Sequence, residues 1–256
     1  MNTLAPSNEL QALEKLRDEE LEEARALQEL MLPSESLCSR GVKICHQFQP
    51  VAAVGGDFLD YFELADGSIG LYLGDVSGKG LPAALFGSLA VGTIRGVHKT
   101  GTSADQVLAT MNRRLMVRGA PMRHAAMQYA VFKPTTREIQ ISSAGMPQPV
   151  HLSGQGCRLL ELSGIPPGLW PSASYDATVL RLDPGDSVLF CTDGVTDAMN
   201  VHEESFGSER LVALCDQHLT ESPMKLLQAL FCAVETFSRG RGPHDDMAAA
   251  VFCCSG

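Results

Sequence analysis

Leucines and charged side chains alternate at helical spacing along the first thirty residues. Residues 8–32 contain no glycine or proline, and their apolar positions recur mostly at intervals of three to five residues. Acidic side chains interrupt a strict heptad, so the pattern predicts one amphipathic helix rather than a regular coiled coil, ended by Pro33. Two interpretations remain open. The helix covers an edge of the domain, or its leucines form a homodimer or transmit a signal.

After Gly41 the pattern changes to short apolar runs separated by turn residues, which is typical of strands. Asp66-Gly67 predicts a hairpin turn, and the turn at 183–186 predicts a second hairpin between the strands on either side of it. The expected strands are 42–48, 58–64, 68–73, 127–132, 139–142, 149–152, 158–162, 176–182, 187–191 and 247–254.

Helices are expected among these strands. Ser103 and Gln106 fit a capping box, and Ser222 followed by Pro223 fits a helix start. The strands come in groups with helices between them, which predicts an α+β architecture with mostly antiparallel sheets. Strands that are apolar throughout, such as 247–253, indicate sheets covered on both faces. The expected helices are 81–97, 103–117, 208–219 and 223–238.

Charge and composition narrow the function. The 256 residues include 20 Lys and Arg against 30 Asp and Glu, a net charge of -10. This excess argues against nucleic acid or an anionic membrane as the main partner. No apolar stretch reaches the ~20 residues that cross a bilayer, and no secretory signal is visible, so we expect a soluble, cytoplasmic protein. The eight cysteines are expected to be buried free thiols.

Aspartates stand beside glycine or another aspartate at the ends of predicted strands. They occur in 55–57, 74–80, 192–194 and 244–246. A carboxylate at the mouth of a buried strand loses hydration unless something pairs with it, and the chain has no conspicuous basic cluster. Hard cations held by oxygen ligands would serve. The glycine-rich segment 74–80 fits neither a phosphate-binding P-loop nor a Gly-x-Ser-x-Gly elbow.

Together these segments resemble the SpoIIE/RsbU-type serine phosphatases, a bacterial branch of the metal-dependent protein phosphatase (PPM, protein phosphatase 2C-like) superfamily. The resemblance runs from about Ala24 to Phe252. It implies an αββα sandwich of two mostly antiparallel sheets flanked by helices, preceded by the N-terminal amphipathic helix. Residues 1–33 would be a linker or signalling helix, and residues 41–254 the phosphatase domain. The matching stretches are 24–33, 54–60, 74–85, 112–115, 182–198 and 245–247.

The resemblance also implies a site with two divalent cations, Mn²⁺ or Mg²⁺. Asp57, Asp75 and Asp193 would carry catalysis through these ions. Asp246 and Asp60 are further candidates, as ligands or as partners of ligands. The implied metal ligands are Asp57, Asp75, the Val76 carbonyl oxygen, Asp193 and Asp245.

The implied reaction is hydrolysis of phosphoserine or phosphothreonine by a metal-activated water. The implied substrate is a signalling protein of the anti-sigma-factor antagonist (STAS) type. A catalytically silent module that regulates a partner and a phosphatase for small phosphoesters stay open as alternatives. His244 is a candidate proton donor, and Arg40 or Arg123 could grip phosphate, although all three also fit an exposed surface.

Other features of the chain bear on substrate contacts and regulation. The chain has Met146 where the family commonly has histidine, which is expected to alter substrate contacts or stability. The two helices after Asp75, at 81–97 and 103–118, resemble a regulatory switch together with the N-terminal helix. Gly87 and Gly92 recur along the first of them, and indicate either close packing or low local stability.

Overall fold

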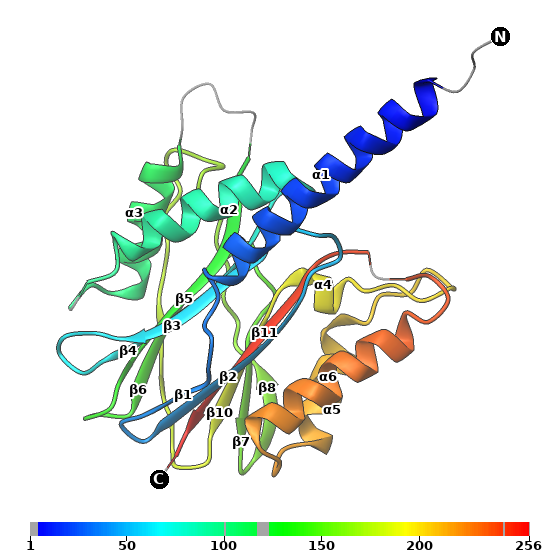
Figure 1. Cartoon of the computed structure of the whole chain (residues 1–256). Coiled ribbons are helices and arrows are strands. Elements are labelled where there is room, and N and C mark those ends of the chain that lie inside the picture. Colours follow the sequence, from blue (N-terminus) through cyan, green and yellow to red (C-terminus); the bar gives the residue numbers. More distant parts are fainter. Residues whose placement is uncertain (1–4, 100, 117–122, 243, 256) are drawn as a thin grey trace.

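Two antiparallel sheets lie face to face at the centre of this computed structural model, which describes residues 5–99, 101–116, 123–242 and 244–255 (Figure 1). The first sheet has the order β1 (Leu37–Ser39), β2 (Val42–Gln49), β11 (Met247–Cys254), β10 (Ser187–Cys191), β7 (Val150–Ser153) and β8 (Gly156–Leu159). The second has the order β3 (Phe58–Glu63), β4 (Ile69–Val76), β5 (Ala125–Lys133), β6 (Glu138–Ala144) and β9 (Thr178–Arg181).

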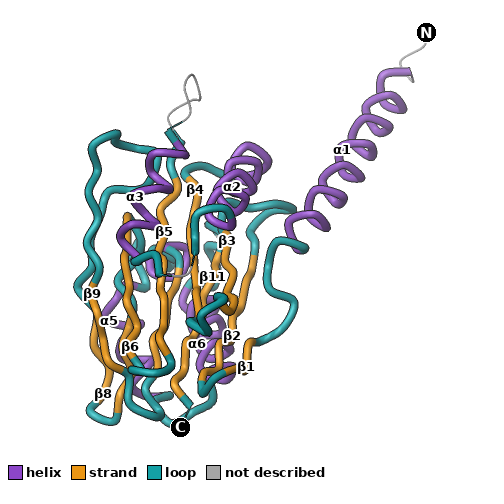
Figure 2. Tube along the Cα trace, turned by 90° about the vertical axis from the view of Figure 1, so that its left-hand side faces the viewer, coloured by secondary structure: helices purple, strands orange, loops and turns teal. Residues whose placement is uncertain are grey.

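Helices cover the outer face of each sheet, as Figures 1 and 2 show from two directions. α2 (Gly80–Arg95) and α3 (Ala104–Leu115) pack on the second sheet. α5 (Gly207–Gln217) and α6 (Pro223–Phe237) pack on the first. The layers are therefore helix, sheet, sheet and helix, which confirms the expected αββα sandwich.

The strand β11 shows why these strands are apolar on both faces. Ala250 and Phe252 point into the core between the sheets, whereas Ala249 and Val251 pack against α5 and α6. Phe252 meets Phe132 of the other sheet with ring centroids 5.1 Å apart. Each central strand therefore contributes to two cores at once.

The second predicted hairpin, around residues 183–186, is wrong. β9 pairs with β6 in the second sheet, and β10 pairs with β7 and β11 in the first, so the turn crosses from one sheet to the other. Gly185 donates its N–H to the Cys254 carbonyl at 2.8 Å, and Cys254 donates to the Asp186 carbonyl at 2.9 Å. Leu182 and Val188 on either side lie in the core between the sheets. Because the chain on both sides of the turn is buried between the sheets, β9 and β10 enter different sheets despite the tight turn.

Smaller expectations about element ends also change. Ser103 stands before α3 but makes no side-chain cap within the described residues. The first helical N–H, that of Ala104, donates to Gln140 Oε1 at 3.0 Å. The predicted end of this helix at 117 lies outside the described residues. The strand expected at 158–162 is Gly156–Leu159. A short helix, α4 (Asp193–Thr196), follows β10 and was not predicted.

The N-terminal helix α1 (Ala5–Glu29) leaves the body of the molecule along most of its length (Figure 2). The side chains of Leu10, Leu13 and Leu16 are 52–60% exposed. At its C-terminal end, Gln28 is only 9% exposed and reaches the domain. The first part of the helix therefore does not cover an edge of the domain.

Two expectations from composition can be compared with the structure. Four of the eight free cysteines are buried (Cys45, Cys191, Cys215 and Cys254), while Cys38 and Cys232 are exposed, so burial holds for only half of them. None of the helices in the described part of the chain is long and apolar enough to cross a membrane.

Candidate metal centre

Strand register brings the predicted aspartates together in two pairs. In the second sheet Phe58 pairs with Gly74, so Asp57 just before β3 and Asp75 near the end of β4 lie at the same end. In the first sheet the end of β10 pairs with the start of β11. Asp193 follows β10, and Asp245 precedes β11, so this pair also lies at one end.

A hydrogen bond between the sheets joins the two pairs. Thr192, the residue after β10, is fully buried and donates its hydroxyl to Asp57 Oδ2 at 2.8 Å. The Ala248 N–H donates to the same hydroxyl oxygen at 3.0 Å, and this fixes the direction of the threonine proton. Thr192 therefore holds a carboxylate of one sheet beside the loops of the other. The sequence pattern alone gives Thr192 no role beyond its place before Asp193.

Burial and neighbouring negative charge together raise the pKa values of Asp57, Asp75 and Asp193. Burial, and then the charge of Asp75, raises the pKa of Asp57 well above its usual range. Burial raises the pKa of Asp75 to about 7, with Asp193 and Asp245 as the next causes. Burial also raises the pKa of Asp193, followed by its acidic neighbours Asp197 and Asp245. Negative charge is concentrated here with little positive charge to offset it.

Asp246 differs from the other candidates because backbone amides already engage both of its oxygens. Oδ1 accepts the Val51 N–H and Oδ2 accepts the Gly56 N–H, each at 2.8 Å. This residue is 6% exposed. Asp246 therefore ties the loop before Asp57 to the start of β11.

Asp60 lies outside the cluster. Its Oδ2 accepts a hydrogen bond from Arg95 Nη2 at 2.9 Å, at the end of α2. The same Arg95 nitrogen donates to the Met31 carbonyl at 3.1 Å. Asp60 therefore connects β3 with α2 and with the segment after α1, rather than with the other aspartates.

Glycine allows the loops around the site to come close. A Cβ on Gly56 would lie 2.9 Å from the Val76 carbonyl oxygen and 3.1 Å from Asp75 Oδ1. The predicted backbone ligand Val76 is thus at the site, in contact with the loop that carries Asp57. A Cβ on Gly87 of α2 would lie 3.4 Å from the Gly56 carbonyl, whereas Gly92 faces open space. Close packing explains Gly87 but not Gly92.

Two further side chains hold these loops, and sequence reasoning did not find their roles. Gln28 of α1 makes a paired contact with Gly55: its Nε2 donates to the Gly55 carbonyl at 2.8 Å, and its Oε1 accepts the Gly55 N–H at 3.0 Å. Arg123 Nη1 donates to the Ser77 carbonyl at 2.6 Å, beside Val76. No local pattern marks Gln28, because its partner lies 27 residues away.

The basic side chains considered for the site lie at different distances from the aspartates along the fold. Arg40 pairs with Glu63 at 3.5 Å, at the far end of β3 from Asp57. Lys79 Nζ lies 3.2 Å from Asp245 Oδ2 and also donates to the His244 carbonyl. His244 directly precedes Asp245 in the same loop.

The donor set fits hard divalent cations. Within the described ranges, no three His, Cys, Asp or Glu side chains lie close enough together to form a ready-made metal site. The aspartate oxygens nevertheless belong to one acidic group, in which Asp57 is buried and Asp75, Asp193 and Asp245 are partly buried. Oxygen ligands with excess negative charge are what Mg²⁺ and Mn²⁺ prefer, and such ions would remove the repulsion.

Comparison with curated proteins finds bacterial relatives. Protein IcfG of Synechocystis is 26% identical over 221 residues, covering 75% of this chain and 35% of that protein. Phosphoserine phosphatase RsbU of Bacillus subtilis is 26% identical over 216 residues, covering 83% of this chain and 63% of that protein. The chain therefore spans about a third of IcfG and less than two thirds of RsbU.

Comparison with solved structures supports the same fold. The SiaA-PP2C domain of Pseudomonas aeruginosa matches with a TM-score of 0.83 and 22% identity, over 94% of this chain and 98% of that domain. The family model for stage II sporulation protein E (SpoIIE) matches residues 65–255, most of the chain. This chain therefore belongs to the SpoIIE family and has the fold of a PP2C-type (PPM) domain.

Proposed function

We propose that this chain is a metal-dependent protein phosphatase that hydrolyses phosphoserine on a bacterial signalling protein. The observation that carries the proposal is the convergence of Asp57, Asp75, Asp193 and Asp245 at the joined ends of the two sheets. The kinship with phosphoserine phosphatase RsbU supports it. By the resemblance, the substrate is of the anti-sigma-factor antagonist (STAS) type. Residues 41–254 would be the catalytic domain and residues 1–33 the linker.

These four aspartates and the Val76 carbonyl would hold two Mn²⁺ or Mg²⁺ ions. When bound, such ions lower the pKa of a water and offset negative charge on the phosphoryl oxygens. Side chains of the protein hold the aspartates and the surrounding loops in position. Thr192 keeps the Asp57 carboxylate in one orientation, and Asp246 keeps the loop at 51–56 in place.

Proton transfer to the departing serine oxygen needs a donor near the site. His244 is the candidate, because its imidazole is a common proton donor and it directly precedes Asp245. Its backbone carbonyl is held by Lys79, which bridges the loop after β4 and the loop before β11. The loop that follows Asp75 and the loop that carries Asp245 are therefore tied together.

Replacing Asp193 tests the enzyme directly. Asp193→Ala should lower Mn²⁺-dependent hydrolysis of p-nitrophenyl phosphate by more than about 100-fold, because loss of even a supporting residue of a metal site typically costs 10–100-fold. Circular dichroism should show that the fold persists. Asp176→Ala, at an exposed aspartate, is the matched control. If wild-type protein has no metal-dependent turnover, the chain is a silent regulatory module instead.

Metal addition should stabilise the protein. At a Mn²⁺ concentration about 100 times the dissociation constant, binding to the folded state contributes about 2.7 kcal/mol and should raise Tm by roughly 5–10 °C. Differential scanning fluorimetry with and without EDTA measures this. Asp193→Ala should reduce the shift, and Asp176→Ala should not. A wild-type Tm that millimolar Mn²⁺ leaves unchanged would contradict the metal assignment.

The Gln28–Gly55 contact links α1 to the loop that carries Asp57. Gln28→Ala leaves the Gly55 N–H and carbonyl without these partners, and a buried unsatisfied group costs about 1–3 kcal/mol. We expect the Mn²⁺ concentration for half-maximal activity to rise by about tenfold. Leu27→Ala, at a neighbouring residue that is 66% exposed, is the control. An unchanged Mn²⁺ requirement in Gln28→Ala would show that α1 does not support the site.

We further propose that α1 forms a homodimer with a second copy of the chain. Four of its leucines, Leu10, Leu13, Leu16 and Leu27, are more than half exposed. Burying them against a partner helix is favourable. A dimer would place a regulatory contact on the helix whose Gln28 touches the site.

Analytical ultracentrifugation tests this. The wild-type chain should sediment as a dimer at micromolar concentration, and Leu13→Glu with Leu16→Glu should give a monomer because both substitutions place charge in the apolar contact. Gln11→Glu, which adds charge on the same helix, is the control. A wild-type chain that stays monomeric at about 100 µM would refute the dimer, because association rises with concentration.

A further inference from the structure

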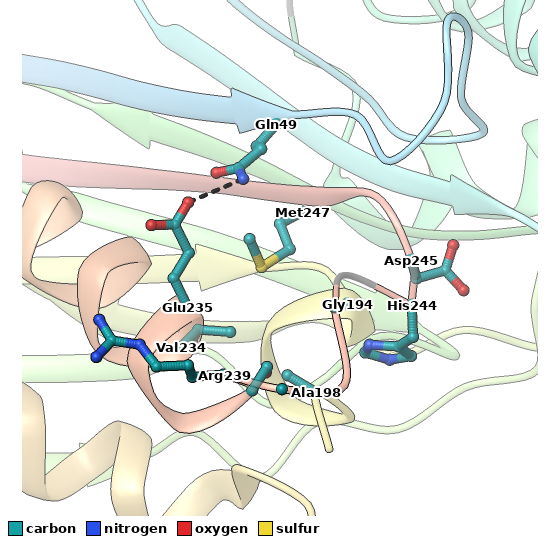
Figure 3. Close-up of a pocket in the computed structure, with 12 residues that line it drawn as sticks. Gln49, Gly194, Ala198, Val234, Glu235, Arg239, His244, Asp245 and Met247 are labelled. Carbon is teal, nitrogen blue, oxygen red and sulfur yellow. Dashed lines mark hydrogen bonds between the residues drawn. The ribbon is translucent and has the colours of Figure 1, made fainter. Parts of the chain in front are cut away.

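A pocket of about 260 Å³ adjoins the candidate metal centre (Figure 3). It lies between the end of α6 and the loop before β11, with Gly194 of α4 and Ala198, two residues after α4, also in the lining. Gly194 and Asp245 form one part of its wall, and Val234, Ala198 and Met247 form much of the rest. Asp245 therefore belongs both to the predicted ligands and to the pocket wall.

Figure 3 shows how the charged side chains are arranged around it. His244 and Asp245 lie together at one end, where the Asp245 carboxylate points away from Met247. Glu235 lies on the α6 side and is held by Gln49 Nε2 at 3.0 Å. The charged groups thus stand at the margins, and apolar side chains line the interior.

Ser238 lies in the wall of the pocket and is 8% exposed. Its hydroxyl oxygen makes no hydrogen bond to any described group, and it is shielded from solvent, so a ligand in the pocket does not reach it. The surface that the pocket offers to a ligand is therefore mainly apolar.

Size and chemistry restrict the occupant. Sites for drug-sized ligands commonly measure about 300–1,000 Å³, so this smaller cavity suits a single large side chain. A second phosphate would need cationic or amide donors. Of those in the lining, Gln49 already donates to Glu235, and the Arg239 guanidinium points away from Met247 in Figure 3. A phosphoprotein substrate offers such an aliphatic side chain close to its phosphoserine.

We propose that this pocket binds one aliphatic side chain of the phosphoprotein substrate, within three residues of the phosphoserine. This inference rests on the proposed function and adds to it a specificity determinant. With phosphoserine at the metal centre, an extended chain that advances about 3.3 Å per residue passes the pocket mouth beside Asp245. The buried side chain is the anchor, as in other interfaces where one residue fills a pocket.

A set of phosphoserine heptapeptides tests the proposal. Each has phosphoserine at its centre and alanine elsewhere, with one leucine moved through the six flanking positions. Leucine at one position should raise kcat/KM by about tenfold or more over the all-alanine peptide, because burying a leucine side chain is favourable by at least that factor. Equal kcat/KM for all seven peptides would overturn the proposal.

Filling the pocket provides the matched variant. In Ser238→Leu the new side chain occupies the cavity, so the ratio of kcat/KM for the best leucine peptide to that for the all-alanine peptide should fall to about one. Thr236→Leu places the same side chain at an exposed position of the same helix, and it should keep the ratio of the wild type. Loss of the ratio in both variants, or in neither, would count against the pocket.

A binding measurement keeps the test independent of turnover and of variant folding. Wild-type protein labelled with ¹³C at its methionine methyl groups is titrated with the peptides in metal-free buffer. The Met247 resonance, assigned from Met247→Leu, should shift with the best leucine peptide and not with the all-alanine peptide. No shift overturns the proposal. If p-nitrophenyl phosphate is not hydrolysed at all, the proposed phosphatase function fails, and this titration alone decides the pocket.

Discussion

Repulsion among closely placed aspartates, one buried and three partly buried, is the constraint on which this molecule depends. Asp57 and Asp75 come from one sheet, and Asp193 and Asp245 from the other, so folding the two sheets together brings like charges together. Such an arrangement is unfavourable unless each carboxylate is held and the charge is offset. The surrounding hydrogen bonds hold the carboxylates, the glycines let the loops approach closely, and the proposed cations would offset the negative charge.

The supports of the site reach into the elements that could regulate it. Gln28 fixes Gly55 from α1, and Gly87 brings α2 against Gly56. Arg95 at the end of α2 joins Asp60 to the segment after α1. A shift of α1 or α2 would therefore move the loop that carries Asp57, without any contact between a regulator and the substrate. The exposed leucines of α1 offer a surface on which a partner can act.

The sequence predicts local features well and long-range pairings poorly. Apolar runs such as β11 showed that the sheets are covered on both faces, because a run without polar alternation has no solvent face. The turn at Asp183–Asp186 looked like a hairpin, yet β9 and β10 join different sheets, because no local signal says which sheet a strand enters. In the site, motif spacing identified the clustered aspartates. It did not find Gln28, whose partner is distant in sequence.

Anomalous X-ray scattering tests the central claim most directly. Crystals of the full chain grown with Mn²⁺ and measured at the manganese absorption edge should show two strong peaks between the sheet ends, within the group formed by Asp57, Asp75, Asp193 and Asp245. Thr192 should keep its hydrogen bond to Asp57 in that structure. An absence of peaks, or manganese bound only elsewhere on the chain, would contradict the account of a metal centre built by the joined sheets.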